Sequence, residues 1–437
     1  MDPLLAARSQ MELSLGFHMI FAALGVAMPV MLVIAEGLWL RTKRAHYLEL
    51  ARTWGKATGV LFAIGAVSGT ALSFELGLLW PRFMAFAGSV IGPAFALEGY
   101  AFFLEAIFIG LYLYGWERLS PRAHWWCGAA VAVSGACSGV LVLGANAFMQ
   151  APSGFTIDGG RAAPTEILAS FATGSFRAMA MHNTLACLCA SAFAMAGVYA
   201  YGILRGKDDD RRRAAITIAM TIAASSAVLQ LVTGDVSARE VAASQPAKLA
   251  AMEAHFATAS HVPLVIGGVV DAANARVTGA LEVPGGLSLL LSRDANAVVA
   301  GLDRVPRGDW PAVGLVHLAF DTMVGAGMTL IAIGAWYWLA RWRKRERSRA
   351  MAWLLVLASP LGFLALEAGW VVAEAGRQPW IVYGVMRTRD AVTPAARVDV
   401  TFALFTVLYA FLAVVLVVVL RRLARARDER PEVSHAR

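Results

Sequence analysis

Residues 370–380 read WVVAEAGRQPW, and this stretch ends a long apolar run with a carboxylate, a guanidinium and two indole rings. Glu374 and Arg377 stand where an apolar helix is expected to leave the bilayer, and Pro379 disfavours continuation of the helix. One interpretation is an ion pair with aromatic anchors at a membrane interface, where Trp and Arg are common. The other is a binding site in which Glu374 faces a cation and Arg377 an anionic group, as the iron and the propionates of a haem require.

The composition indicates a membrane protein. The chain has 437 residues, of which 58% are hydrophobic and 16% charged, and its mean hydropathy is +0.61. Soluble domains carry roughly 25% charged residues. We predict an all-α fold, a polytopic membrane helix bundle with about nine transmembrane helices of ~20 residues each and one long outer loop. The predicted spans are residues 13–40, 57–80, 94–116, 124–147, 170–204, 214–232, 311–340, 350–373 and 399–420.

The distribution of Lys and Arg predicts the orientation of the chain. Alternate connections together with the C-terminal segment hold 24 of the 38 basic residues. Basic connections are retained in the cytoplasm, which places the N-terminus outside and the C-terminus in the cytoplasm. The net charge of +8 therefore reflects topology, and its expected partner is the lipid bilayer, not nucleic acid. No cleavable signal peptide is apparent, because Asp2, Arg8 and Glu12 precede an apolar run that is too long for one.

The spans divide the chain into three parts. Residues 1–232 hold transmembrane helices 1–6, and residues 311–437 hold helices 7–9 with a basic cytoplasmic tail. Residues 233–310 form the longest polar stretch, which we predict to be an extracytoplasmic loop, and loops of this length are often functional. Within it, residues 245–256 favour a helix that displays Lys248 and Glu253. Taken alone, these two residues would be an ordinary solvated pair.

Several polar residues fall inside apolar spans, where ionisable side chains are rare and usually functional. Glu98 and Glu105 are seven residues apart and share one helix face, which favours a proton path or a bound cation. Asn146 and Gln150, at the end of the fourth span, are expected to bond to backbone or neighbouring side chains. The other intramembrane polar residues in the predicted outer half are His18, Glu75, His182, Met323, Glu374 and Arg377.

Histidine, methionine and carboxylate are the side chains that haem iron uses as ligands. A His–Met pair gives a six-coordinate, low-spin haem, whereas a single His or Glu leaves a position open for oxygen. The sequence has no C-x-x-C-H motif and no nucleotide-binding loop. Any haem is therefore expected to be non-covalent, and the electrons to come from a lipid-soluble donor that docks on the long outer loop.

The sequence resembles subunit I of the cytochrome bd quinol oxidases over essentially its whole length. GRQPW after a membrane span is a highly specific signature of that family. The stretches that carry the resemblance are MELSLGFHMIF (11–21), GTALSFELGLLWPRFM (69–84), EGYAFFLEAIFIGLYLYGWERL (98–119), MHNTLA (181–186), KLAAMEA (248–254) and EAGWVVAEAGRQPW (367–380).

The resemblance implies three haems. His182 and Met323 match the axial pair of a low-spin haem b that receives electrons from quinol. His18 and Glu374 match the ligands of two high-spin haems, a haem b and an oxygen-binding haem d or further haem b, with the assignment of each ligand to each haem left open. Asp321 is a departure, because many members carry arginine two residues before the axial methionine, so the propionates of that haem need compensation from elsewhere.

The resemblance also implies roles for the remaining candidates. Lys248 and Glu253 match quinol-binding residues of the outer loop. Glu98 and Glu105 match acids that deliver protons or compensate charge, and Arg377 joins them as a catalytic residue. The residues that match those packing on haem and its propionates are Trp370, Arg377 and Trp380.

The implied function is that of a quinol:oxygen oxidoreductase in a bacterial inner membrane. Electrons would pass from quinol through the low-spin haem to a high-spin di-haem site that reduces O2 to water, building a proton gradient without pumping. The implied partner is a second homologous membrane subunit, and a small single-helix subunit is a further candidate. An alternative is a haem-containing membrane conduit that oxidises quinol for another acceptor, which Asp321 favours modestly. A transporter with carboxylate gates would not explain GRQPW together with His182 and Met323.

Overall fold

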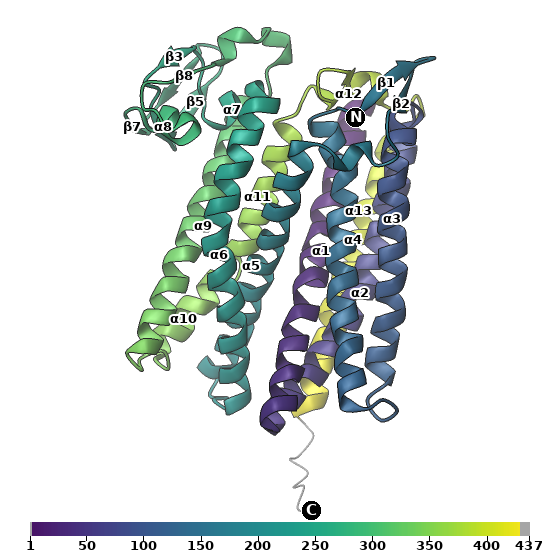
Figure 1. Cartoon of the computed structure of the whole chain (residues 1–437), viewed down its shortest axis with the longest axis vertical. Helices are drawn as coiled ribbons and strands as arrows, with labels where there is room; N and C mark the ends of the chain where they lie inside the picture. The colour runs from purple at the N-terminus through teal and green to yellow at the C-terminus, as the bar shows by residue number, and fades with distance from the viewer. Residues whose placement is uncertain (1, 429–437) are drawn as a thin grey trace, which may run out of the picture.

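The computed structural model describes the backbone of residues 2–428 and side chains as far as residue 422. Nine segments of this part of the chain are long and apolar enough to span a membrane, which confirms the predicted helix bundle (Figure 1). The end of the predicted basic tail, residues 429–437, lies outside the described residues. The spans are α1 (Pro3–Thr42), α2 (Ala45–Leu79), α3 (Pro81–Tyr114), α4 (Pro121–Gln150), α5 (Gly174–Leu204), α6 (Asp210–Ser244), α9 (Val313–Trp342), α10 with α11 (Arg349–Ala358 and Leu361–Ala375) and α13 (Val398–Asp428).

Several helices extend beyond their predicted bounds, and α1, α2, α3 and α6 do so by ten or more residues at one end. Helix α1 starts at Pro3, because Pro suits the first helical position and the Asp2 side chain caps the helix by accepting from the backbone N–H of Leu5. Helix α6 continues to Ser244, so the predicted boundary at residue 232 lies inside it. Its added turns carry Asp235 and Arg239, which form an i,i+4 ion pair.

The eighth span is divided, not continuous as predicted. Helix α10 ends at Ala358 and α11 begins at Leu361, with Pro360 between them. Proline lacks the N–H that an uninterrupted helix needs, so it fits the first residues of a new helix. The break separates the basic end of the span from α11, which leads into the GRQPW stretch.

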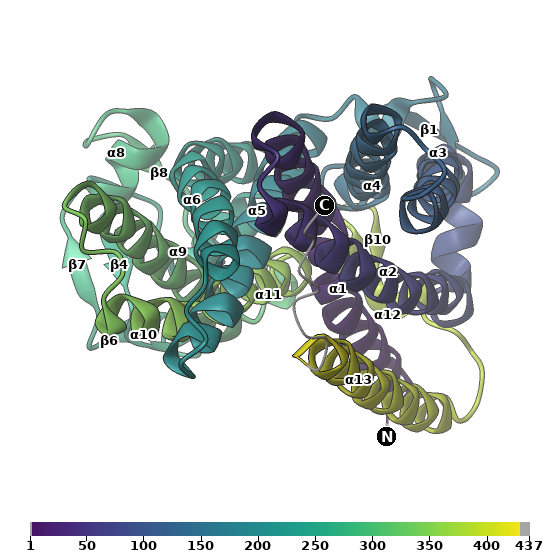
Figure 2. The ribbon, with the colours of Figure 1, turned by 90° about the horizontal axis from the view of Figure 1, so that it is seen from below.

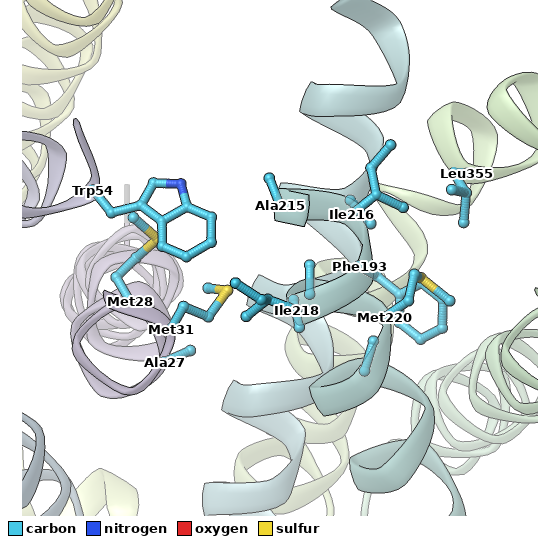
Figure 3. Packing of buried hydrophobic residues seen from close by; sticks show 14 of the residues in the cluster. Ala27, Met28, Met31, Trp54, Phe193, Ala215, Ile216, Ile218, Met220 and Leu355 are labelled. Carbon is cyan, nitrogen blue, oxygen red and sulfur yellow. The ribbon is translucent and has the colours of Figure 1, made fainter. Parts of the chain in front are cut away.

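The helices form two groups that meet along α1 and α5 (Figures 1 and 2). Helices α1 to α4 and α13 make one group, and α5, α6, α9, α10 and α11 make the other. The largest buried cluster joins them through Met28 and Met31 of α1, Trp54 of α2, and Phe193 of α5 with Met220 of α6 (Figure 3). The indole of Trp54 donates a 2.9 Å hydrogen bond to the hydroxyl of Tyr199. This polar contact ties α2 to α5 inside the core.

Alanine allows the backbones of α5 and α6 to approach closely. Small residues recur every fourth position on both helices, and every one of them is almost fully buried. In a bilayer, such small-residue faces associate through van der Waals packing because no hydrophobic driving force acts between helices. These residues are Ala192, Ala196 and Ala200 on α5 and Ala215, Ala219, Ala223 and Ala227 on α6.

The long connections lie together at one end of the bundle (Figure 1). Residues 245–312 begin with helix α7, Pro246–Met252, within the predicted 245–256 helix, and continue as antiparallel pairs of short strands. Another connection follows α11 and holds the end of the GRQPW stretch. The connecting elements are β1 (Phe155–Asp158), β2 (Arg161–Pro164), η1 (Ala169–Phe171), α7, β3 (Ala259–Ser260), β4 (Leu264–Ile266), β5 (Val269–Asp271), β6 (Arg276–Thr278), β7 (Leu281–Val283), α8 (Gly286–Ser292), β8 (Val298–Val299), η2 (Leu302–Arg304), η3 (Arg307–Asp309), β9 (Trp380–Val382), β10 (Met386–Arg387) and α12 (Thr388–Ala391).

A closed polar cluster joins three helices at the opposite end. Glu36 of α1 is fully buried and accepts hydrogen bonds from the Tyr112 hydroxyl at 2.9 Å and from Nδ1 of His124 at 2.8 Å. The other ring nitrogen of His124 lies 2.9 Å from the backbone carbonyl of Tyr112. Because every member has a partner, the cluster can fix α1, α3 and α4 to one another without an unpaired buried charge.

Candidate functional site

A cavity of about 630 Å³ lies between α1, α2, α3, α4 and α11. Its size falls within the range of ligand pockets, and its wall is mostly apolar with a few converging polar groups. Among the predicted site residues, the ones that line it are His18, Glu98, Glu105, Trp370, Glu374 and Arg377. Predicted site residues from three distant parts of the sequence therefore meet at one cavity.

His18 of α1 lines the cavity, and one of its ring nitrogens is hydrogen-bonded to the neighbouring helix α2. Its Nδ1 lies 3.0 Å from the hydroxyl of Ser68 on α2, and that hydroxyl donates in turn to the carbonyl of Gly65 at 3.1 Å. Because the single hydroxyl hydrogen is used in this way, Ser68 accepts from Nδ1–H of His18. Nε2 is then unprotonated and has no hydrogen-bond partner among the described residues, which is the form in which imidazole binds iron.

Glu374 and Arg377 approach the cavity from the end of α11. The two side chains form an ion pair, and the other carboxylate oxygen of Glu374 accepts from the amide of Asn146 at 2.8 Å. Arg377 is 2% exposed and also donates to the carbonyl of Ile381, whereas its Nε has no partner in the described part of the chain. A buried guanidinium with a spare donor suits an anionic group such as a haem propionate.

Glu98 and Glu105 face α4 from α3. The hydroxyl of Ser138 donates to Glu98 at 3.1 Å. Glu105 is 6% exposed and lies against Gly135, where an added Cβ would stand 2.9 Å from a carboxylate oxygen. A larger residue at position 135 would therefore displace this carboxylate from its present position. Both acids lie on the cavity wall, as their seven-residue spacing predicts.

Of Trp370, Trp380 and Glu75, only Trp370 lines the cavity. The indole of Trp380 is covered by the guanidinium of Arg387, 4.6 Å from the ring centroid, because the chain has already left α11 and entered strand β9. Glu75 faces Gln10, whose amide donates to it at 2.9 Å, and does not line the cavity either.

His182 and Met323 lie in the other group of helices. The Nδ1 of His182 is 3.3 Å from the hydroxyl of Thr233 on α6, so both candidate haem histidines face a helical hydroxyl through Nδ1. Its Nε2 is 3.2 Å from the amide nitrogen of Gln230, which would have to move for iron to bind. Met323 packs against α11 at Gly369, where an added Cβ would lie 3.0 Å from the sulfur.

Lys248 and Glu253 are buried, not solvated, with 3% and 5% of their surfaces exposed. They do not pair. Lys248 donates to Gln150 of α4, and burial, with a smaller contribution from Arg377, lowers its pKa to about 7. Glu253 lies toward Asp321 of α9, and burial together with that negative charge raises its pKa to about 8. One of its oxygens has no hydrogen-bond partner among the residues described.

Asp321 of α9 forms a hydrogen bond with the 245–312 connection. Its carboxylate accepts from the backbone N–H of Gly267 at 2.6 Å and lies 3.4 Å from Nε2 of His317. Nδ1 of His317 lies 2.7 Å from the carbonyl of Met252, next to Glu253. The acid that departs from the family pattern therefore fixes the connection beside Glu253.

Arg8 and Glu12 also line the cavity, although neither is among the site residues predicted from the sequence. The predicted first span began after them because a hydropathy window excludes charged residues. Their spacing of four residues on an extended helix would have placed both on one face. Glu367 of α11 is likewise absent from the predicted site residues, and one of its oxygens has no partner in the described structure.

The chain is similar to known proteins over nearly its whole length. The model of the family described as cytochrome bd terminal oxidase subunit I matches residues 6–428. A putative cytochrome bd menaquinol oxidase subunit I of Bacillus subtilis is 39% identical over 96% of both chains. A cytochrome bd ubiquinol oxidase subunit 1 of the same organism is 32% identical over 95% of this chain and 92% of its own length. The solved bd oxidase structure from Geobacillus thermodenitrificans superposes with a TM-score of 0.92 at 38% identity, covering 97% of this chain and 99% of that one. This chain therefore belongs to the cytochrome bd terminal oxidase subunit I family.

Proposed function

We propose that this chain is the subunit of a membrane quinol:oxygen oxidoreductase that binds both haem and quinol. The observation that carries the proposal is the cavity wall, which combines an imidazole nitrogen without a partner among the described residues, four glutamates and a buried guanidinium with a spare donor. This donor set fits axial ligation of iron and binding of propionates. When bound, haem would supply the one-electron chemistry that connects quinol oxidation to oxygen reduction.

The ligands we propose follow the family pattern. His182 and Met323 would hold a low-spin haem b. His18 and Glu374 would hold a high-spin haem b and an oxygen-binding haem d or further haem b. Arg377 would bind propionate, and Trp370 would pack against a porphyrin face. Trp380 would support the propionate side of the haem from strand β9, where the guanidinium of Arg387 stacks on its ring.

The quinol-binding residues would be Lys248 and Glu253. Glu253 has a carboxylate oxygen without a partner in the described structure, so it can accept a proton from a quinol hydroxyl. Lys248 has its ammonium group in a buried position, where it can compensate negative charge that develops as the quinol loses protons. Both residues lie at the end of the bundle that the distribution of basic residues predicts to be outside.

Glu98 and Glu105 would hold protons for water formation. Both belong to one face of α3, which faces α4, and both line the cavity. If these protons come from the cytoplasm and quinol protons leave outside, turnover builds a gradient without pumping. The cytochrome bd oxidases are multi-subunit membrane complexes, and we propose that a second homologous subunit accompanies this chain, with room for a small single-helix subunit.

A reduced-minus-oxidised absorption spectrum of the purified complex, with chemical haem analysis, tests the proposal. Signals of low-spin b, high-spin b and a chlorin d would support the full haem set. Signals of b haems alone would support the quinol oxidase with a further haem b in place of haem d. Absence of haem would overturn the proposal, and quinol oxidation without oxygen uptake would favour a conduit to another acceptor.

A further inference from the structure

Two amide side chains of α4 connect the 245–312 segment to the cavity. The ammonium group of Lys248 donates to Oε1 of Gln150. The amide nitrogen of Gln150 donates to Oδ1 of Asn146 at 3.1 Å, and the amide nitrogen of Asn146 donates to Glu374 at 2.8 Å. An unbroken series of three hydrogen bonds therefore runs from a lysine of α7 to a carboxylate of the cavity.

The direction of this series is determined by Lys248 together with two neighbours of Gln150, because the carbonyl of Ala373 accepts from the amide nitrogen and Gln245 donates to the amide oxygen. A lysine ammonium group can only donate, so the oxygen of Gln150 must face Lys248. The nitrogen of Gln150 then faces Asn146, which must present its own oxygen there. The nitrogen of Asn146 is left to face Glu374. Removing the lysine would leave Gln150 oriented by these neighbours, but it would take away the cation that polarises the two amides toward Glu374.

The environment makes these hydrogen bonds strong. Lys248 and Gln150 are each 3% exposed, and hydrogen bonds gain strength in a low-dielectric interior. Gln150 is held further by its neighbours, because its nitrogen also donates to the carbonyl of Ala373 at 3.2 Å and its oxygen also accepts from Gln245 at 3.0 Å. Amides neither take up nor release protons near neutral pH, so this series orients and polarises the carboxylate but does not conduct protons.

We propose that Lys248, Gln150 and Asn146 are positioning residues for Glu374. Lys248, with the carbonyl of Ala373 and the amide of Gln245, orients Gln150; its positive charge polarises the two amides, and the last amide presents N–H to the carboxylate. The inference rests on the proposed role of Glu374 as a haem ligand. It gives Lys248 an action at the cavity in addition to its proposed contact with quinol, and it assigns a function to Asn146 and Gln150.

The test compares the purified complex carrying Lys248→Met with that carrying Gln150→Glu. Gln150→Glu preserves side-chain volume and the acceptor for Lys248, but it removes the donor to Asn146. The readouts are haem content, the absorption spectrum of the high-spin haems, and their midpoint potentials. A carboxylate whose N–H donor is lost or less polarised becomes a stronger electron donor and stabilises oxidised iron, so both variants are expected to lower a high-spin potential. A tenfold change in the redox equilibrium corresponds to about 59 mV for one electron.

Two control variants define the pathway. Gln245→Leu removes a hydrogen bond to the same oxygen of Gln150 but leaves the series intact, so it should retain the wild-type spectrum and potential. Lys248→Arg keeps a donor-only cation and should restore the wild-type spectrum. The double variant Lys248→Met with Gln150→Glu should resemble either single variant, because both act through one path.

The inference is overturned if Lys248→Met and Gln150→Glu keep wild-type spectra and potentials and Lys248→Met changes only the KM for quinol. An equal shift in Gln245→Leu would also overturn it, because any disturbance around Gln150 would then suffice. If a variant fails to assemble, the remaining single variants and Lys248→Arg decide. Absence of haem from the wild-type complex would instead refute the proposed function itself.

Discussion

The charge of Asp321 beside buried Glu253 leads to a prediction about the pH dependence of quinol oxidation. Burial and Asp321 raise the pKa of Glu253 to about 8. A carboxyl with that pKa is ionised in about one molecule in eleven at pH 7. If Glu253 accepts the quinol proton, only the ionised fraction is active, and the rate should rise as pH increases through about 8.

Replacing Asp321 with Asn removes the charge but keeps an oxygen that can accept from the backbone N–H of Gly267, now 2.6 Å from the carboxylate. The pKa of Glu253 should fall, and the rising limb should move to lower pH. A fall to about 7 would ionise half of the molecules at pH 7, which increases the rate at that pH about fivefold. The largest possible gain is about elevenfold, because the ionised fraction cannot exceed one.

The assay is oxygen uptake with a water-soluble quinol over a pH series, reported as kcat/KM, for the wild type and three variants. In Glu253→Gln, the rise of kcat/KM with pH should disappear. Glu282→Gln should leave it in place, because Glu282 is an exposed carboxylate of the same connection. The haem spectrum of Asp321→Asn is recorded as well, since Met323 is two residues away. A limb that stays in place or moves to higher pH in Asp321→Asn would refute the reasoning.

Three further substitutions test other parts of the argument. Glu105→Ala should lower oxygen consumption while haem is retained, and full activity would remove its role as a proton relay. Glu36→Ala should destabilise the protein by about 3–5 kcal/mol, because it leaves the ring of His124 buried without its partner; thermal unfolding in detergent with little change would contradict this. Ser68→Ala removes the partner of His18 Nδ1 and should weaken haem retention about 10–100-fold, so unchanged haem content after dilution would show that Ser68 does not position the ring.

Hydropathy predicted the nine spans because an apolar run of bilayer length is a local property of the sequence. It placed one end of each of α1, α2, α3 and α6 ten or more residues inside the observed helix. In α1 and α6 the reason is that charged residues interrupt the apolar signal. In α1 these charges, Arg8 and Glu12, face the cavity. In α6, Asp235 and Arg239 neutralise each other on the helix surface. Both outcomes depend on neighbours that a hydropathy window does not include.

Six of the predicted site residues line the cavity, but their partners could not be predicted from the sequence. Glu98 and Glu105 share a helix face by spacing alone, and the structure brings both to the cavity wall. Lys248 and Glu253 suggested a surface pair, but α7 is buried and directs them to different neighbours. Trp380 follows the signature closely in sequence and still lies off the cavity, because the chain turns into β9 after α11. Turns and helix contacts determine these results, and no local pattern encodes them.

The buried carboxylates of this bundle show what distinguishes a structural acid from a functional one. Glu36 uses both oxygens, and its partners His124 and Tyr112 are themselves satisfied, so the cluster requires nothing further. Glu253 keeps an oxygen without a partner among the described residues, and Glu105 stands at the cavity wall. A carboxyl that is left incomplete in an apolar environment is stable only when it is protonated or when a ligand completes it. Proton transfer therefore needs such an incomplete acid, whereas Glu374, the proposed iron ligand, has a hydrogen-bond partner for each oxygen. In the sequence, all four are simply glutamates among apolar residues.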